Sequence, residues 1–399
     1  MKNLIPSLLV VALMLCACDK KETLEVISEK SPFGDFYMHV DTVSIPITEE
    51  QFFIYPLFGI VNEDDSTYLF GFNPIQYSID IFNLSSEKFF RKISLEKQGP
   101  NGIPEVISFT PVTLDSLFVM SSYQIALINK EGEIQDKISI NNYNSSVKGH
   151  DSEEAFFWVE KNQPLHYNSK NHKLYGLYHS MQYADCDKRR YQSDQLVSAI
   201  DLKKRKMSHL PVSYPADKRE DYYGFMSRLF VNWDRDSLLY NFRHDPNIYL
   251  YDLDREETTV FDGRSQYTRN RVPPIGWYEC QDASRKLDHS LYSVNFEGII
   301  RDPYRKLYYR FHRKELPEGS KPNEYIVSDK TLFLTIFDNG MAKTGEMIMD
   351  SRPYPSHVSF PTERGLYVAA PSGENTLNFH VFKVFLTKGN STEYGTIID

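Results

Sequence analysis

Apolar and polar residues alternate along most of this chain, in short runs bounded by turn residues, which is the pattern of half-buried β-strands. One element recurs: a polar turn followed by an apolar and aromatic strand. It appears six times at intervals of about 50 to 70 residues, which is typical of repeated β units with loops of variable length. The copies are centred on Tyr68, Phe118, Tyr175, Leu239, Tyr308 and Tyr367.

Each copy lies within a larger unit. An apolar run precedes the copy, and in most copies a third run follows and ends in Asn or Asp before a polar turn and a further strand. Asn and Asp bond their own backbone and tolerate tight turns, so they suit this corner. The residues at this place are Asn83, Asn129, Asp201, Asp252 and Asp338. The unit is therefore expected to be a four-stranded antiparallel meander.

Radial repetition of four-stranded sheets is the β-propeller architecture, so we expect an all-β protein, a six-bladed propeller of antiparallel blades. The last copy lacks a convincing fourth strand, whereas the segment from Tyr37 to Ile47 is strand-like and has no blade of its own. We expect this N-terminal strand to become the outer strand of the last blade and to close the ring, which leaves no long exposed edge. A pair of stacked β-sandwiches is the alternative architecture.

The stretch Gln98 to Ile103, QGPNGI, interrupts the alternation between the first two units. It lacks the Lys-Ser/Thr pair that completes a phosphate-binding loop. Proline fixes one backbone dihedral and glycine permits a reversal, so the stretch is expected to be a corner between blades.

The N-terminus is typical of an export signal. Lys2 supplies a positive charge, and the apolar core from Leu4 to Leu15 is too short to span a bilayer as a stable helix. Leu15 and Ala17 precede Cys18 at the spacing of a bacterial lipoprotein signal, which this segment resembles. An ordinary secretory signal with an incidental cysteine is the alternative.

The resemblance divides the chain into a signal peptide at residues 1–17, a lipidated polar tether at 18–34 and the propeller at 35–399. We expect Cys18 to carry the lipid, palmitate included, and to attach the protein to the cell envelope, at the outer membrane. The pair Lys21-Glu22 loosely resembles the signal that sends such lipoproteins to the cell surface.

Beyond the signal, Cys186 and Cys280 are the remaining cysteines. In an oxidising compartment they could form one disulfide, but sequence does not show whether their Cα atoms lie within bridging distance. Two cysteines do not by themselves make a zinc site.

The net charge of the chain limits the classes of partner that it is expected to bind. The net charge of -9 argues against a general affinity for nucleic-acid backbones, which depends on Lys and Arg neutralising phosphates. The basic run from Lys203 to Lys206 occupies the same hairpin turn as SSEK and DREE in the sister units, so it is expected to be a solvated turn.

Most of the inserted sequence is expected on one face of the ring, because loops between second and third strands and connections between blades emerge together. Loops on a rigid scaffold are where binding usually occurs, and aromatic planes with arginine suit a sugar or a peptide. The alternative is that these aromatics pack the loops against the blades. The candidate ligand-binding residues on this face are Trp277, Tyr278, Arg264, Arg269, Arg271, Tyr222 and Tyr223.

A second candidate site lies at the entries to the presumed inner strands, where polar residues would converge on the ring axis. Carboxylates and imidazoles there could hold a divalent cation, the one cofactor this pattern allows, or act as acid and base. The alternative is that strand entries are hydrated in any case, since the intervals follow no ligand code. The residues are Glu105, Glu154, His289 and His357.

The lipoprotein signal, the six irregular β repeats and the GPNGI corner after FFRKISLE together resemble an uncharacterised family of Bacteroidota lipoproteins, a domain of unknown function with a six-bladed, NHL-like propeller. The resemblance implies the fold and an envelope location, with no activity to carry over. The favoured hypothesis is a lipid-anchored binding or scaffold module for a glycan, a peptide or an envelope protein. The alternative is an envelope hydrolase or lyase that works at the axis.

Overall fold

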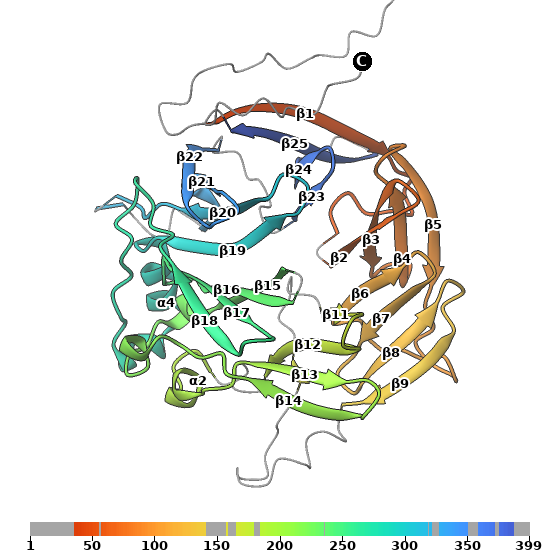
Figure 1. Ribbon diagram of the computed structural model, residues 1–399, viewed down its shortest axis with the longest axis horizontal. Helices are drawn as coiled ribbons and strands as arrows, with labels where there is room; N and C mark the ends of the chain where they lie inside the picture. Colours follow the sequence, from red (N-terminus) through yellow and green to blue (C-terminus); the bar gives the residue numbers. More distant parts are fainter. Residues whose placement is uncertain are drawn as a thin grey trace, which may run out of the picture.

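The computed structural model describes residues 36–55, 57–140, 157–158, 165–178, 184–234, 236–317, 319–320, 327–349, 358–371 and 375–386. Within these residues six antiparallel β-sheets are arranged as a ring (Figure 1). The predicted six-bladed β-propeller is confirmed. None of the helices in these ranges has the length and apolar character needed to cross a membrane.

The blades follow one another along the chain, each with its first strand innermost. Blade 1 contains β2 (Phe58–Glu63), β3 (Ser66–Asn73), β4 (Ser78–Asn83) and β5 (Lys88–Ser94). Blade 2 contains β6 (Ser108–Thr113), β7 (Ser116–Met120), β8 (Gln124–Asn129) and β9 (Ile134–Ser139). Blade 3 contains β10 (Phe157–Trp158), β11 (His166–Asn168), β12 (Lys173–Tyr178), β13 (Val197–Asp201) and β14 (Lys206–Leu210).

The second half of the ring is built in the same way. Blade 4 contains β15 (Leu229–Asp234), β16 (Ser237–Phe242), β17 (Ile248–Asp252) and β18 (Glu257–Phe261). Blade 5 contains β19 (Asn295–Asp302), β20 (Leu307–Arg313), β21 (Leu332–Phe337) and β22 (Lys343–Ile348). Blade 6 contains β23 (Ser359–Thr362), β24 (Gly365–Ala369), β25 (Thr376–Leu386) and β1 (Phe36–Pro46).

The N-terminal strand closes the ring, as predicted. β1 pairs with β25 over its whole length, with Val43 opposite Phe379 and Ile45 opposite Leu377. Val43 and Ile45 are fully buried. The last blade is thus assembled from both ends of the propeller, and the outer edge of β25 is covered.

The side chains of Asn and Asp that end the third strands form the predicted turns. The Asp201 Oδ1 atom accepts hydrogen bonds from the backbone N–H groups of Lys203 and Lys204, at 3.0 and 2.8 Å. Asp252 and Asp338 accept from the next turn residues in the same manner. Because these bonds are local, the corner could be recognised from sequence.

The QGPNGI corner also has the predicted role. Gly99 has a φ of 93°, a value that favours glycine, and the Gly102 N–H donates to the Gly99 carbonyl at 3.0 Å. The Asn101 side chain accepts from the Ile134 N–H at 3.1 Å, which ties the corner to the outer strand of blade 2.

The core lies between the blades. The second and third strands of a blade are covered on both faces by the neighbouring blades. This explains why all residues of β21, the third strand of blade 5, are buried. Inner strands approach closely: a Cβ atom on Gly59 would lie 2.4 Å from the Pro111 side chain, so only glycine fits where blades 1 and 2 meet.

Strand direction alternates within each blade, which gives the ring two different faces. Turns between first and second strands and between third and fourth strands leave the turn face. Loops between second and third strands and connections between blades leave the opposite side, the loop face. Within the described ranges, every short helix is in a loop-face connection: α2 (Lys188–Gln192), η2 (Ala216–Lys218), η3 (Gly224–Ser227), α3 (Trp277–Cys280), α4 (Ala283–Leu291) and η5 (Val327–Asp329).

Candidate functional site

Three loop-face insertions pack into one structure beside blades 3 to 5, which we call the cap: residues 184–196, 211–228 and 262–294 (Figure 1). Two of its helices, α2 and α4, begin at aspartate caps. The Asp187 carboxylate accepts from the Arg189 N–H at the start of α2, and the Asp282 carboxylate accepts from the Ser284 N–H at the start of α4. These local signals fix where these two helices start.

The interior of the cap is aromatic. The Tyr191 hydroxyl accepts from the Tyr223 N–H at 3.0 Å and donates to the Asp185 carbonyl at 2.5 Å. The Tyr223 ring stacks on His244 of blade 4, with ring centroids 4.0 Å apart. The three insertions therefore share a core with the propeller, and the cap is not a set of independent loops.

A disulfide between Cys186 and Cys280 joins two of the insertions, with Cα atoms 5.7 Å apart. Ile275 and the partly buried Tyr222 pack against it. Nearby, the Lys286 ammonium pairs with the Asp185 carboxylate at 3.0 Å. The pairing that sequence left open is thus present in the structure, and it fixes α3 to the loop that precedes α2.

The surface of the cap carries large apolar side chains. Tyr278 is 81% exposed and Trp277 is 49% exposed, and their rings meet edge to face at 5.1 Å. Phe225 of η3 and Leu287 of α4 are exposed as well, and the Lys286 ammonium lies 4.7 Å from the centre of the Phe225 ring. Exposed aromatics on a rigid base can stack on a sugar or fill a partner's pocket.

The predicted aromatic residues separate into two groups. Trp277 and Tyr278 lie on the surface, as a ligand-binding role requires. Tyr223 is buried, with 1% of its surface exposed, so the expectation that it faces a ligand is corrected: it belongs to the core of the cap. Tyr222 is half-buried against the disulfide, with the Lys188 ammonium 5.3 Å from its ring centre.

The predicted arginines all lie on the connection 262–272. Arg264 is paired with the Asp262 carboxylate, and its hydrogen bonds hold the pKa of Asp262 at about 2. Arg269 lies 3.7 Å from a carboxylate oxygen of Glu315, and Arg271 is exposed. These guanidinium groups are presented to solvent along the edge of the cap and do not converge on one point.

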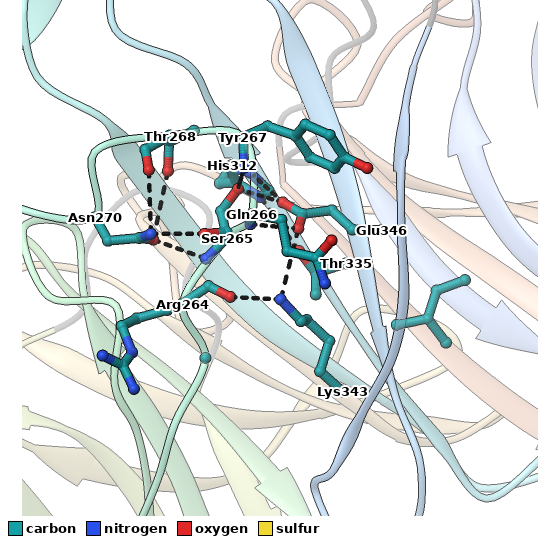
Figure 2. Close-up of polar contacts among 12 residues, drawn as sticks. Arg264, Ser265, Gln266, Tyr267, Thr268, Asn270, His312, Thr335, Lys343 and Glu346 are labelled. Carbon is teal, nitrogen blue, oxygen red and sulfur yellow. Dashed lines mark hydrogen bonds and ion pairs between the residues drawn. The ribbon is translucent and has the colours of Figure 1, made fainter. Parts of the chain in front are cut away.

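A buried polar network fastens this connection to blade 5, as Figure 2 shows. The Ser265 hydroxyl and the Gln266 N–H both donate to the Glu346 carboxylate of β22. His312 of β20 places its Nε2 atom 2.9 Å from Glu346 Oε1, and its Nδ1 atom lies 3.3 Å from the Thr335 hydroxyl. Both His312 and Glu346 are almost fully buried.

The charge state of this pair follows from its surroundings. Burial alone would raise the pKa of Glu346, but His312 and the hydrogen bonds from Ser265 and Gln266 hold that pKa below its usual value. Burial lowers the pKa of His312. The network is therefore an anionic carboxylate beside a neutral imidazole, and it positions the 262–272 connection. The carboxylate lies between the serine and the histidine, which is not the order of a nucleophilic triad.

The predicted axial residues do not form a site in the described part of the chain. Glu105 is exposed beside β6, where its carboxylate accepts from the Ser122 N–H at 3.1 Å. His289 is on α4, across the ring, and its Nε2 atom lies 2.7 Å from the Pro273 carbonyl (Figure 1). His289 thus belongs to the cap, which corrects its expected place at the axis, while Glu154 and His357 lie outside the described residues. The described residues contain no group of three or more His, Cys, Asp or Glu side chains that could hold a metal ion.

Sequence reasoning missed Phe225 and Leu287, which share the cap surface with Trp277 and Tyr278. It also missed Lys330, a buried lysine at the end of η5. Its ammonium donates to the carbonyl of Ser290 in the last turn of α4, to the carbonyl of Ser293 and to the Asn295 side chain. Burial lowers the pKa of Lys330 to about 7. No local pattern marks these positions, because each depends on an insertion folding back onto another.

Known proteins resemble this chain in fold. A crystal structure of a DUF4221 family member from Bacteroides vulgatus ATCC 8482 has a TM-score of 0.73 and 18% identity, covering 88% of this chain and 99% of that one. A protein from Bacteroides fragilis NCTC 9343 that is described as exported has a TM-score of 0.58 and 11% identity, covering 88% and 96%. No curated protein matches the sequence.

The family assignment comes from the sequence itself. The model of the family described as Domain of unknown function (DUF4221) matches residues 34–348, which span blades 1 to 5 and β1. The resemblance inferred from the repeats is therefore confirmed, and the chain belongs to the DUF4221 family.

Proposed function

We propose that this protein is a lipid-anchored module of the cell envelope that binds a glycan, a peptide or an envelope protein through the surface of the cap. The observation that carries the proposal is the exposure of Trp277 and Tyr278 on a helix that a disulfide ties to a second insertion of the cap. Large side chains held in this way lose little conformational freedom on binding.

The chemistry of the surface suits such partners. Tyr and Trp combine a broad apolar face with a polar group, and they are enriched among the residues that dominate binding energy. Phe225 extends the apolar surface, and the exposed Arg271 offers donors for a carboxylate or a sugar hydroxyl. The net charge of -9 favours such partners over nucleic acid.

Binding is tested with glycan and peptide arrays, followed by titration of the best ligand. The double variant Trp277→Ala, Tyr278→Ala is expected to weaken that ligand about 30-fold or more, because paired aromatic anchors often contribute at least 2 kcal/mol. The matched control is Tyr123→Ala, an aromatic residue that is 62% exposed on the loop face of blade 2. Equal loss in both variants, or arrays without any ligand, would contradict the proposal.

Attachment to the envelope is a separate part of the proposal. It rests on the spacing of Leu15, Ala17 and Cys18 in the N-terminal signal, which lies outside the described residues. Cys18→Ser is expected to abolish incorporation of labelled palmitate and to release the protein from the membrane fraction. Cys16→Ser is the control and should leave labelling intact. Labelling that survives in Cys18→Ser would contradict this assignment.

A further inference from the structure

The insertion 211–228 of the cap covers a buried histidine of blade 4. His244 follows β16 by two residues and is 2% exposed. The rings of Tyr223 and Tyr214 lie nearly parallel to its imidazole, with centroids 4.0 and 6.1 Å away. Its Nδ1 atom lies 3.0 Å from the Met226 carbonyl. All three of these neighbours belong to the same insertion.

This position suits a neutral imidazole and opposes a charged one. A carbonyl only accepts, so Nδ1 of His244 carries a proton and donates it to Met226, and Nε2 is the unprotonated nitrogen. Within the described residues, the buried Nε2 atom has no hydrogen-bond partner. A proton added to Nε2 would place a charge and an unsatisfied donor in an aromatic core. The insertion must therefore move before His244 can become charged.

The charged groups around His244 do not offset its burial. Asp245, the next residue, and Asp217 of η2 favour a charged imidazole, whereas Lys218 of η2 opposes it. The Asp245 carboxylate already accepts a hydrogen bond from the Tyr249 hydroxyl. Burial has the largest effect, and it lowers the pKa of His244 from its ordinary value of 6.5 to about 4.

Two further charged side chains contact the hydroxyls of the stacked tyrosines. A carboxylate oxygen of Asp221 lies 3.5 Å from the Tyr223 hydroxyl, and Nε of Arg190 on α2 lies 3.5 Å from the Tyr214 hydroxyl. Burial raises the pKa of Tyr223, so its phenol is neutral in acid and neutral solution.

The insertion 211–228 is also the part of the cap that the disulfide does not fasten. The disulfide joins the other two insertions and leaves this one held by noncovalent contacts. Two ion pairs join it to the neighbouring insertion: Lys188 with Glu220 at 2.9 Å, and Arg219 with Asp194 at 2.7 Å. Surface pairs of this kind contribute little stability. Because Lys188 holds the pKa of Glu220 below its usual value, that pair remains charged in mildly acid solution.

We propose that the insertion 211–228 is an acid-sensitive flap, which opens when His244 takes up a proton. Opening requires no change in the sheet, because His244 lies beyond the end of β16. Phe225 belongs to the insertion, so opening also removes part of the exposed apolar surface of the cap. The lower affinity of the cap that follows at acid pH rests on the function proposed above, whereas the flap itself does not.

The direction of the pH dependence follows from the two charge states. The pKa of His244 is about 4 in the closed flap and returns toward 6.5 when water reaches the ring. The closed form is therefore fully favoured above the higher value, and this advantage is lost as the pH falls toward the lower one. Between them the open form binds one more proton, so the ratio of open to closed flap rises by up to about tenfold for each pH unit.

The test is hydrogen exchange of the purified full chain without ligand. The probes are the Tyr223 N–H, which donates to the Tyr191 hydroxyl, and the Met226 N–H, which donates to the Tyr223 carbonyl. After correction for the intrinsic exchange rate at each pH, the opening constant of both amides is expected to rise roughly 50-fold between about pH 7 and about pH 4.5. The strands of blades 1 and 2 should not show this rise.

Two variants remove the titrating group. His244→Phe keeps an aromatic ring in the stack, and His244→Gln keeps a hydrogen-bond donor. Both are expected to abolish the rise, and because the change with pH is measured, a lower stability at every pH does not imitate this result. His166→Gln is the matched control. His166 is a histidine of β11 in blade 3 that stacks on Trp233 at 4.4 Å, and burial lowers its pKa as well. This variant should keep the rise.

Four results would overturn the proposal: no rise in the wild-type protein, a rise that persists in both His244 variants, a rise that His166→Gln also abolishes, or an equal loss of protection in blades 1 and 2. The outcome is independent of the ligand of the cap. If the flap opens as expected and the arrays give no ligand, the function proposed for the cap fails while the flap stands.

Discussion

Deleting residues 36–46 is expected to abolish cooperative unfolding of the propeller. The deletion removes β1, the outer strand of blade 6, which pairs with all eleven residues of β25. It also removes Val43 and Ile45 from the core, at about 1.5–3 kcal/mol for each side chain. The outer edge of β25 is then open to pairing with another chain. Circular dichroism melts and light scattering should show a broad transition and self-association.

Point variants test the contribution of the buried side of β1 without removing the strand. Val43→Asp puts a charge where the side chain is fully buried, and we expect a loss of more than about 3 kcal/mol in the free energy of unfolding. Thr42→Asp is the matched control on the exposed side of the same strand, with an expected change within about 0.5 kcal/mol. A synthetic peptide of residues 36–46 should restore cooperative melting to the deleted chain. Normal melting of the deleted chain without peptide would show that β1 does not close the ring.

The place of β1 could be predicted because the propeller follows from local signals and a count of strands. Alternation with a period of two marks the strands, and Asn or Asp marks the corner after the third strand of a blade. Six repeated units leave the N-terminal strand without a blade and the last blade without a fourth strand, so the two are expected to pair. In blade 3 the pattern was less informative, since β10 and β11 are separate short strands that both pair with β12.

Which aromatic residues face a ligand could not be predicted, and Tyr222 and Tyr223 show why. Tyr222 forms an isolated bridge with Ile275, whereas Tyr223 directly precedes η3 and has a non-extended backbone, with φ of -126° and ψ of -1°. Tyr223 turns into the core of the cap and stacks on His244, while Tyr222 lies against the disulfide. The direction of each ring depends on contacts with residues far away in the sequence, and no local pattern encodes these contacts.

The position of His289 could not be predicted for a different reason. The residue precedes the inner strand β19 by six residues, a position that predicts a place at the ring axis. The helix α4 intervenes, starting at the Asp282 cap, and carries His289 to the Pro273 carbonyl. The cap residue followed by ASRKLDHSL is a readable helix signal, but strand-like repeats on both sides made a strand entry the simpler interpretation.

Replacing Cys186 and Cys280 by serine is expected to lower the free energy of unfolding by about 2–5 kcal/mol. The bond spans 94 residues of sequence, so it removes much conformational freedom from the unfolded chain. We expect the loss to be greatest in the cap. Hydrogen exchange should accelerate in α2 (Lys188–Gln192) and α3 (Trp277–Cys280) before it does in the strands of blades 1 and 2.

Reduced wild-type protein is the matched control, because it keeps both sulfur atoms and lacks only the bond. If reduction and Cys→Ser substitution destabilise equally, the effect comes from the cross-link and not from packing at Ile275. Denatured, unreduced protein should show no maleimide-reactive thiol at Cys186 or Cys280. Two free thiols there would contradict the disulfide. Since such bonds persist in oxidising compartments, the same assay also bears on whether the chain folds after export.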